Sequence, residues 1–150
     1  MKSIGLRFQR ARRLLGVALL GLCALGWGSR TSAVQDPTPN PNIEKLLATR
    51  ACRGCDFTNT TIVNKDLSGV DLTGATFNGG GLYACNLTGA NLEDANFRDG
   101  LLKRSDLKDA RVIGADFSGA DLSYAQNANL QGATTTSATT CPDASKGPCR

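Results

Sequence analysis

The sequence predicts a solenoid made of short turning segments that close into a coil with four sides. Three observations support this fold class: large apolar residues recur at every fifth position over residues 57–122, small residues precede them by two positions, and four phenylalanines lie twenty residues apart. A period of five fits neither an α-helix, with about 3.6 residues per turn, nor a strand, with a period of about two. Neither regular element would keep these residues on one face.

The apolar residue of each repeat is treated as its centre, and all fourteen centres are large. They are Phe57, Ile62, Leu67, Leu72, Phe77, Leu82, Leu87, Leu92, Phe97, Leu102, Leu107, Val112, Phe117 and Leu122. Twelve of the fourteen residues that stand two positions earlier are small, which suits a tight interior. Lys65 and Val70 are the exceptions, so we expect the wall to bulge there or the lysine to turn outward. The other positions are mostly polar and suit turns or solvent.

The spacing of the phenylalanines predicts the number of sides. Phe57, Phe77, Phe97 and Phe117 are separated by four repeats each, so a four-sided coil would stack the rings in one column. A coil with three or five sides would scatter them. Stacked rings gain about 0.5–1.5 kcal/mol per pair beyond burial. The remaining columns would be Ile62, Leu82, Leu102 and Leu122; Leu67, Leu87 and Leu107; and Leu72, Leu92 and Val112.

The repeats resemble those of the pentapeptide-repeat family over about residues 55–140. Two clear copies are Ala90-Asn91-Leu92-Glu93-Asp94 and Ala115-Asp116-Phe117-Ser118-Gly119. The resemblance implies an all-β fold, a right-handed four-sided parallel β-helix. Residues 46–56 are similar to the segment that leads into the coil in exported cyanobacterial members, which implies the periplasm or the thylakoid lumen.

Both ends of the repeat are predicted to carry caps. Residues 34–41 form a proline-punctuated linker, and residues 42–54 form a short capping α-helix and the turn into the coil, with Asn42 as N-cap and Ile43, Leu46 and Leu47 on one face. The register breaks near Asn127, because the repeat restarts at Ala128. We therefore expect an irregular last coil up to residue 140 and a C-terminal cap or tail over residues 141–150.

Residues 1–33 read as a signal peptide. A basic leader precedes an apolar run over residues 14–27, and small residues at Thr31 and Ala33 suit cleavage. The run is shorter than the roughly 20 residues that span a bilayer, so we expect no membrane span after cleavage. Arg12 and Arg13 leave both the general secretory and the twin-arginine routes open. Cleavage leaves eleven basic and thirteen acidic residues, a net charge of −2, which offers no basic footprint for nucleic acid.

The candidate chemistry is sparse. The chain has no histidine, so it lacks the commonest general base near neutral pH. Its regularly spaced aspartates stand before the centres, where turns need polar side chains. A disulfide between Cys141 and Cys149 would clip the C-terminal cap, and Cys52 and Cys55 suit a structural pair or, alternatively, a thiol-redox site. Cys85 suits a small buried position. We expect no catalytic residue, metal or cofactor.

One coil carries a cluster of basic residues, which we name the basic band. It comprises Arg98, Lys103, Arg104, Lys108 and Arg111, with aspartates among them. A solvated charge ring and a docking band for an acidic partner both fit this pattern. The sequence thus predicts an exported, non-enzymatic scaffold or protein-binding module. The alternatives are a gyrase-inhibiting DNA mimic, as in some family members, and a thiol-redox protein acting through Cys52 and Cys55.

Overall fold

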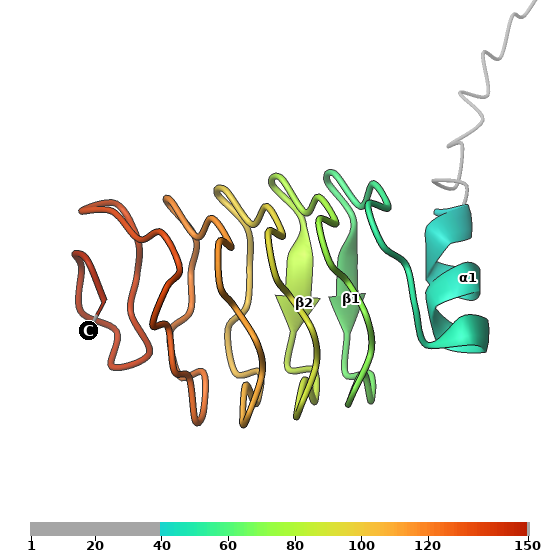
Figure 1. Cartoon of the computed structure of the whole chain (residues 1–150). Coiled ribbons are helices and arrows are strands. Elements are labelled where there is room, and N and C mark those ends of the chain that lie inside the picture. The colour runs from blue at the N-terminus through green and yellow to red at the C-terminus, as the bar shows by residue number, and fades with distance from the viewer. Residues whose placement is uncertain (1–39, 150) are drawn as a thin grey trace, which may run out of the picture. The chain divides into compact units, whose positions relative to one another are not determined.

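The computed structural model describes residues 40–149, so the predicted signal peptide and all but the last two residues of the predicted linker lie outside the described part. The described part begins with one helix, α1 (Pro41–Thr49), and continues as successive turns of a coil that are stacked on one another (Figure 1). Two strands follow the helix, β1 (Thr61–Val63) and β2 (Gly81–Tyr83). Within residues 40–149, no helix is long and apolar enough to cross a membrane.

Four ladders of parallel bridges hold the coil together, one along each side. Each ladder joins residues that are twenty positions apart. Twenty residues therefore make one full turn of the coil, with five residues to each side. They are Ala51, Asp71, Asn91 and Arg111; Asp56, Thr76, Asn96 and Asp116; Thr61, Gly81, Leu101 and Asp121; and Asp66, Asn86, Asp106 and Gln126. We name the four sides the Cys52, Phe57, Ile62 and Leu67 faces, after the first inward residue of each.

The amount of regular strand is smaller than an all-β prediction suggests. Only the Ile62 face forms strands, where β1 and β2 pair in parallel with Ile62 opposite Leu82. The other faces are single bridges followed by turns. At an ordinary corner the small residue donates its N–H to the preceding centre, as Ala75 does to the Leu72 carbonyl at 3.0 Å. Such tight turns leave room for only one ladder residue per side.

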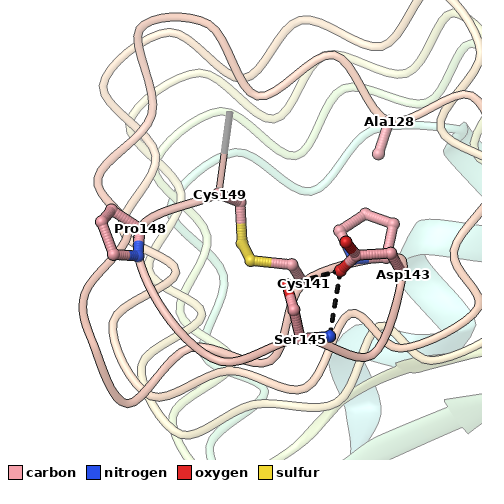
Figure 2. Close-up of a pocket in the computed structure, with 7 residues that line it drawn as sticks. Ala128, Cys141, Asp143, Ser145, Pro148 and Cys149 are labelled. Atoms are coloured by element: carbon pink, nitrogen blue, oxygen red, sulfur yellow. Dashed lines mark hydrogen bonds between the residues drawn. A yellow bond between two sulfur atoms is a disulfide. The ribbon is translucent and has the colours of Figure 1, made fainter.

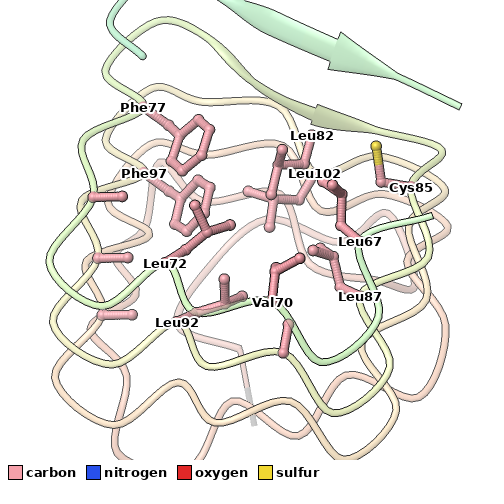
Figure 3. Close-up of a cluster of buried hydrophobic side chains, with 14 of the residues drawn as sticks. Leu67, Val70, Leu72, Phe77, Leu82, Cys85, Leu87, Leu92, Phe97 and Leu102 are labelled. Carbon is pink, nitrogen blue, oxygen red and sulfur yellow. The ribbon is translucent and has the colours of Figure 1, made fainter. Parts of the chain in front are cut away.

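The interior is a column of apolar side chains from all four faces, as Figure 3 shows for the middle coils. All fourteen centres are buried. The four phenylalanine rings stack, with centroids 4.7, 4.7 and 5.3 Å apart and planes within 15° of parallel. The twenty-residue spacing therefore places like side chains directly above one another.

The two larger residues at the small positions, Lys65 and Val70, are placed differently. Lys65 turns outward and is exposed, whereas Val70 is fully buried in the core. Lys65 follows β1, where the chain stays extended through Val63 and turns at Asn64, which has a φ of 53°. The lysine thus stands outside the wall at a corner that differs from the ordinary turn.

Helix α1 covers the N-terminal end of the coil, and its N-cap lies two residues earlier than predicted. Its N-cap is Asn40 and not Asn42: the Asn40 side chain accepts a hydrogen bond from the Asn42 N–H at 3.0 Å. Pro41 explains the shift, because a residue without an N–H suits the first helical position. Leu46 is buried against the core. The helix ends at Thr49, where Arg50 adopts the left-handed conformation.

The last coil is irregular after Asn127. Asp116 pairs with Thr134 and Asp121 with Thr140, so the register falls from twenty residues to eighteen and nineteen. Asn127 stands where the next centre would fall, but it is exposed and donates to the Asp106 carboxylate at 2.8 Å. Beyond it the chain turns back, and Lys146 pairs antiparallel with Thr140. The coil therefore ends in a hairpin.

Candidate interaction surface

The basic band lies on one coil but is divided among all four faces. Arg98 follows Phe97 on the Phe57 face, and Lys108 follows Leu107 on the Leu67 face. Arg111 is a ladder residue of the Cys52 face, and Lys103 and Arg104 follow Leu102 on the Ile62 face. A single flat partner cannot contact all five side chains. The structure does not gather the band into one site.

Two members of the band are already paired with carboxylates. Arg98 lies 3.2 Å from Asp116, and Arg111 lies 2.6 Å from Glu93. These pairs are largely exposed, so each contributes little to stability, about 0–1 kcal/mol. Their consequence for recognition is larger, because a paired guanidinium offers less unbalanced charge to a partner.

Lys103 and Arg104 differ from the two paired arginines of the band. Among residues 40–149, neither has a carboxylate within salt-bridge distance. The Lys103 ammonium lies over the Tyr124 ring, 5.8 Å from its centroid. Arg104 is exposed at a left-handed turn position with a φ of 62°. Of the three cations of the band without an ion pair among residues 40–149, the Ile62 face therefore holds two, and the third, Lys108, lies on the Leu67 face.

The charge of each face confirms that the Ile62 face is distinct. We count the ladder residue, the centre and the two turn residues of every coil along each side. The Ile62 face then has two cations against one carboxylate, Asp121, a net charge of +1, whereas the Phe57, Leu67 and Cys52 faces have −2, −2 and −1. It is the one positive face among the described residues.

The same face exposes apolar side chains. Val63 is 44% exposed, Leu101 38% and Tyr124 60%, and Tyr83 is half-buried in register with Val63. Of the five large hydrophobic residues exposed in residues 40–149, the other two are Leu47 on α1 and Ile113 on the Cys52 face. Exposed aromatic residues beside arginine are typical of protein interfaces. Sequence reasoning identified the basic residues and missed these apolar neighbours, which the twenty-residue register would have aligned.

The aspartates of the repeat serve the turns. Asp56 accepts a hydrogen bond from the Thr58 N–H at 2.8 Å, and Asp116 accepts one from the Ser118 N–H at 2.9 Å. The Thr58 hydroxyl and N–H together hold the pKa of Asp56 below its ordinary value. These carboxylates stay ionised and cap backbone groups, which is the opposite of what a general acid needs.

The four cysteines predicted to pair do so at the two ends of the coil. Cys52 is bonded to Cys55 and Cys141 to Cys149, with S–S distances of 2.03 and 2.09 Å. Cys52 and Cys55 are buried, and they follow α1 instead of opening a helix. In thiol-redox proteins a helix N-terminus next to the cysteine lowers the pKa of its thiol. This pair follows a helix, so its thiols are not activated in that way. Cys85 is free and buried, and burial raises the pKa of its thiol.

A shallow depression of about 420 Å³ lies at the C-terminal end, next to the Cys141–Cys149 disulfide (Figure 2). Asp143 and Ser145 line it, and the Ser145 hydroxyl donates to the Asp143 carboxylate at 2.6 Å. Both residues are exposed. Hydrogen bonds from Ser145 hold the pKa of Asp143 below its ordinary value, so the carboxylate is a weak base. The arrangement stabilises a turn.

The fold defines a class: a four-sided repeat solenoid with parallel ladders along its sides. The family model for pentapeptide repeats matches residues 52–80 and 85–123 in eight copies. The chain belongs to the pentapeptide-repeat family, whose members fold as right-handed four-sided β-helices. No curated protein matches the sequence significantly.

The chain is similar to several solved structures. The pentapeptide repeat protein Rfr23 from the cyanobacterium Cyanothece 51142 aligns with a TM-score of 0.54 at 20% identity, over 66% of this chain and 96% of that one. A thylakoid-lumen pentapeptide repeat protein of Arabidopsis thaliana aligns with a TM-score of 0.25 at 20% identity, over 63% and 71%. QnrB1, a plasmid-mediated fluoroquinolone resistance protein, aligns with a TM-score of 0.35 at 22% identity, over 59% and 63%. The likeness to Rfr23 supports the fold alone.

Proposed function

We propose that this protein is an exported, non-enzymatic scaffold that binds another protein through the outside of its coil. The observation that carries the proposal is the Ile62 face, where exposed Val63, Leu101 and Tyr124 lie beside Lys103 and Arg104. A stacked coil presents such a face rigidly, so the scaffold loses little conformational entropy when a partner binds. Proteins of this family are in general structural or protein-binding modules, which agrees with this reading.

Export is part of the proposal, and it rests on the sequence of residues 1–33. The basic leader, the apolar run and the small residues before Val34 have the order of a secretory signal. The two paired disulfides agree with an oxidising compartment such as the periplasm or the thylakoid lumen. N-terminal sequencing of the protein from fractionated cells would test this, and a chain beginning at Met1 in the cytosolic fraction would contradict it.

Chemical crosslinking of the protein in its native compartment, followed by mass spectrometry, tests the binding proposal. We expect crosslinks between residues of the coil and one recurrent protein. Neutralising Lys103 and Arg104 together tests whether the cations of the Ile62 face contribute, because an acidic partner should then be recovered less. If the crosslinked proteins are the same as those obtained with an unrelated exported protein, the scaffold function is wrong.

The two alternatives are distinguished by direct assays. A DNA mimic would inhibit gyrase supercoiling, whereas the positive Ile62 face and exported location predict no inhibition. A thiol oxidoreductase would accelerate reduction of insulin, and a Cys52→Ser variant would abolish this. We expect no gyrase inhibition for the reason just given. We expect no reduction of insulin because Cys52 and Cys55 are buried.

A further inference from the structure

We propose that the Ile62 face binds one extended acidic segment of the partner protein, with a large apolar side chain of that segment over Val63 and Tyr83 and its carboxylates at Lys103 and Arg104. This inference rests on the proposed function and specifies it in three respects: the face, the form of the partner and the order of its side chains along the rod.

The order follows from the ladders. Val63 lies in register with Tyr83, and Leu101 bridges Gly81, so the apolar part of the face begins at the N-terminal end of the coil. Lys103 and Arg104 belong to the next turn, followed by Tyr124. Successive turns of a parallel sheet are about 4.8 Å apart. An apolar anchor over Tyr83 would therefore stand about 5–10 Å from a carboxylate that pairs with Arg104.

The size of the face argues for a single segment. Each strand residue advances about 3.3 Å, so three residues give a width of about 10 Å, and four turns extend about 15 Å along the rod. A surface of this size buries about 150 Å² on one partner, against about 800 Å² in a stable protein interface. The contact is therefore a weak one. A second copy of the rod, face to face, would also bring its own Lys103 and Arg104 against the same two cations, whereas a segment one strand wide would cover the whole surface without that repulsion.

Charge argues for an acidic segment. The other three faces are net negative, and they would repel such a segment, so the Ile62 face is favoured both by attraction and by exclusion of the alternatives. Asp121 is the one carboxylate on the face, at the C-terminal end of the Leu101 ladder. Its negative charge would repel the carboxylates of the segment, so the acidic part should lie on the side of Arg104 that faces β2.

The experiment places one photoreactive side chain on each face of the same coil, in the full chain expressed in its own cells. Thr73, Asn78, Tyr83 and Thr88 occupy the same position of four successive repeats, so they form a matched set. We expect crosslinks at Tyr83, and we expect the crosslinked partner peptide to carry several Asp or Glu residues next to one large apolar residue. An Arg104→Glu change should lower the yield at Tyr83 about fivefold, because it replaces one attractive pair by repulsion.

Lys108→Glu is the control, since it makes the same charge change on the Leu67 face of the same coil and should leave the yield unchanged. Equal yields at all four positions, a partner peptide without acidic residues, or a covalent dimer of this chain would each overturn the inference while protein binding itself stands. Crosslinks at none of the four positions would overturn the proposed function as well.

Discussion

A buried hydroxyl at Ser105 completes a corner of the coil that the backbone leaves open. At β2 the Cys85 N–H does not reach the Leu82 carbonyl, as it would in an ordinary turn. Instead, the Ser105 hydroxyl donates to the Leu82 carbonyl at 2.6 Å and accepts from the Cys85 N–H at 3.0 Å. One coil earlier, the Cys85 thiol donates to the Ile62 carbonyl at 3.4 Å. Polar side chains thus bridge the two corners that follow β1 and β2.

Replacing Ser105 with alanine should destabilise the fold by about 2–3 kcal/mol, because two buried backbone groups lose their partner. Urea unfolding followed by circular dichroism would measure the loss. Ser105→Cys should lose less, since a thiol at the equivalent position one coil earlier still donates to a carbonyl. Equal midpoints for the alanine variant and the parent would show that the hydroxyl does not bridge the corner.

At this scale, the sequence predicted which residues point inward but not how the corners are closed. The five-residue period requires only that Phe57 and its successors share a column, and it does not distinguish the corner after Leu82 from the corner after Leu72. That difference depends on whether the residue after the centre stays extended, as Tyr83 does, or turns. Lys65, a long side chain where a small one was expected, was the sequence feature that indicated an unusual corner.

Helix α1 acts as an element that satisfies the open edge of the first coil. Side chains of Asn40 and Asn42 donate to the Asp56 carbonyl at 2.9 and 3.0 Å. The Arg50 guanidinium donates to the carbonyls of Asp66 and Ser68. An uncapped coil end presents unpaired edge groups, as any edge strand does. The helix was predictable as an element, whereas its contacts to the edge were not, because they join residues about sixteen positions apart.

An Arg50→Ala change should therefore lower stability by about 1 kcal/mol and speed amide exchange in the first coil. Arg53→Ala is the matched control: its ion pair with Asp71 is 3.5 Å long and 69% exposed on the arginine side, so we expect a loss below about 0.5 kcal/mol. Hydrogen exchange with mass spectrometry reports both effects. Identical protection of residues 56–70 in the two variants would contradict this role of Arg50.

For the whole molecule, stability should fall in acid and stay flat near neutral pH. Six aspartates have a folded-state pKa below the ordinary value; they are Asp56, Asp66, Asp71, Asp116, Asp121 and Asp143. A depressed folded pKa stabilises the protein above the unfolded value, near 3.8, and this contribution is lost as pH falls through the folded pKa. The chain has no histidine, so little titrates from pH 5.5 to 7.

Thermal unfolding between pH 2 and 8 would show this profile. In Asp116→Asn, the amide oxygen still accepts from the Ser118 N–H, so the variant should keep its fold and lose part of the acid dependence. A melting temperature that falls steeply between pH 7 and 5.5 would contradict the assignment to aspartates.

The four-sided architecture leads to a prediction about deletions, because each full turn uses twenty residues. Removing residues 71–90 joins Val70 to Asn91, which then takes the place of Asp71 on the Cys52 face, and it returns Phe97 to a place directly above Phe57. Removing residues 71–85 also preserves the repeat pattern, but it rotates everything after the junction by one face, so Phe97 stands above Ile62. We expect the shorter deletion to be the less stable protein although it keeps five more residues.

The difference should be at least about 1 kcal/mol, since the twenty-residue deletion keeps two phenylalanine stacks and the fifteen-residue deletion keeps one. The corner bridges provide a second reason: in the twenty-residue deletion Ser105 lies above the corner after β1, where it can replace the Cys85 thiol. Urea midpoints of the two variants, measured by circular dichroism, decide the matter. Equal or reversed midpoints would mean that the columns can be exchanged, and the stability of the coil would then depend on the five-residue pattern alone.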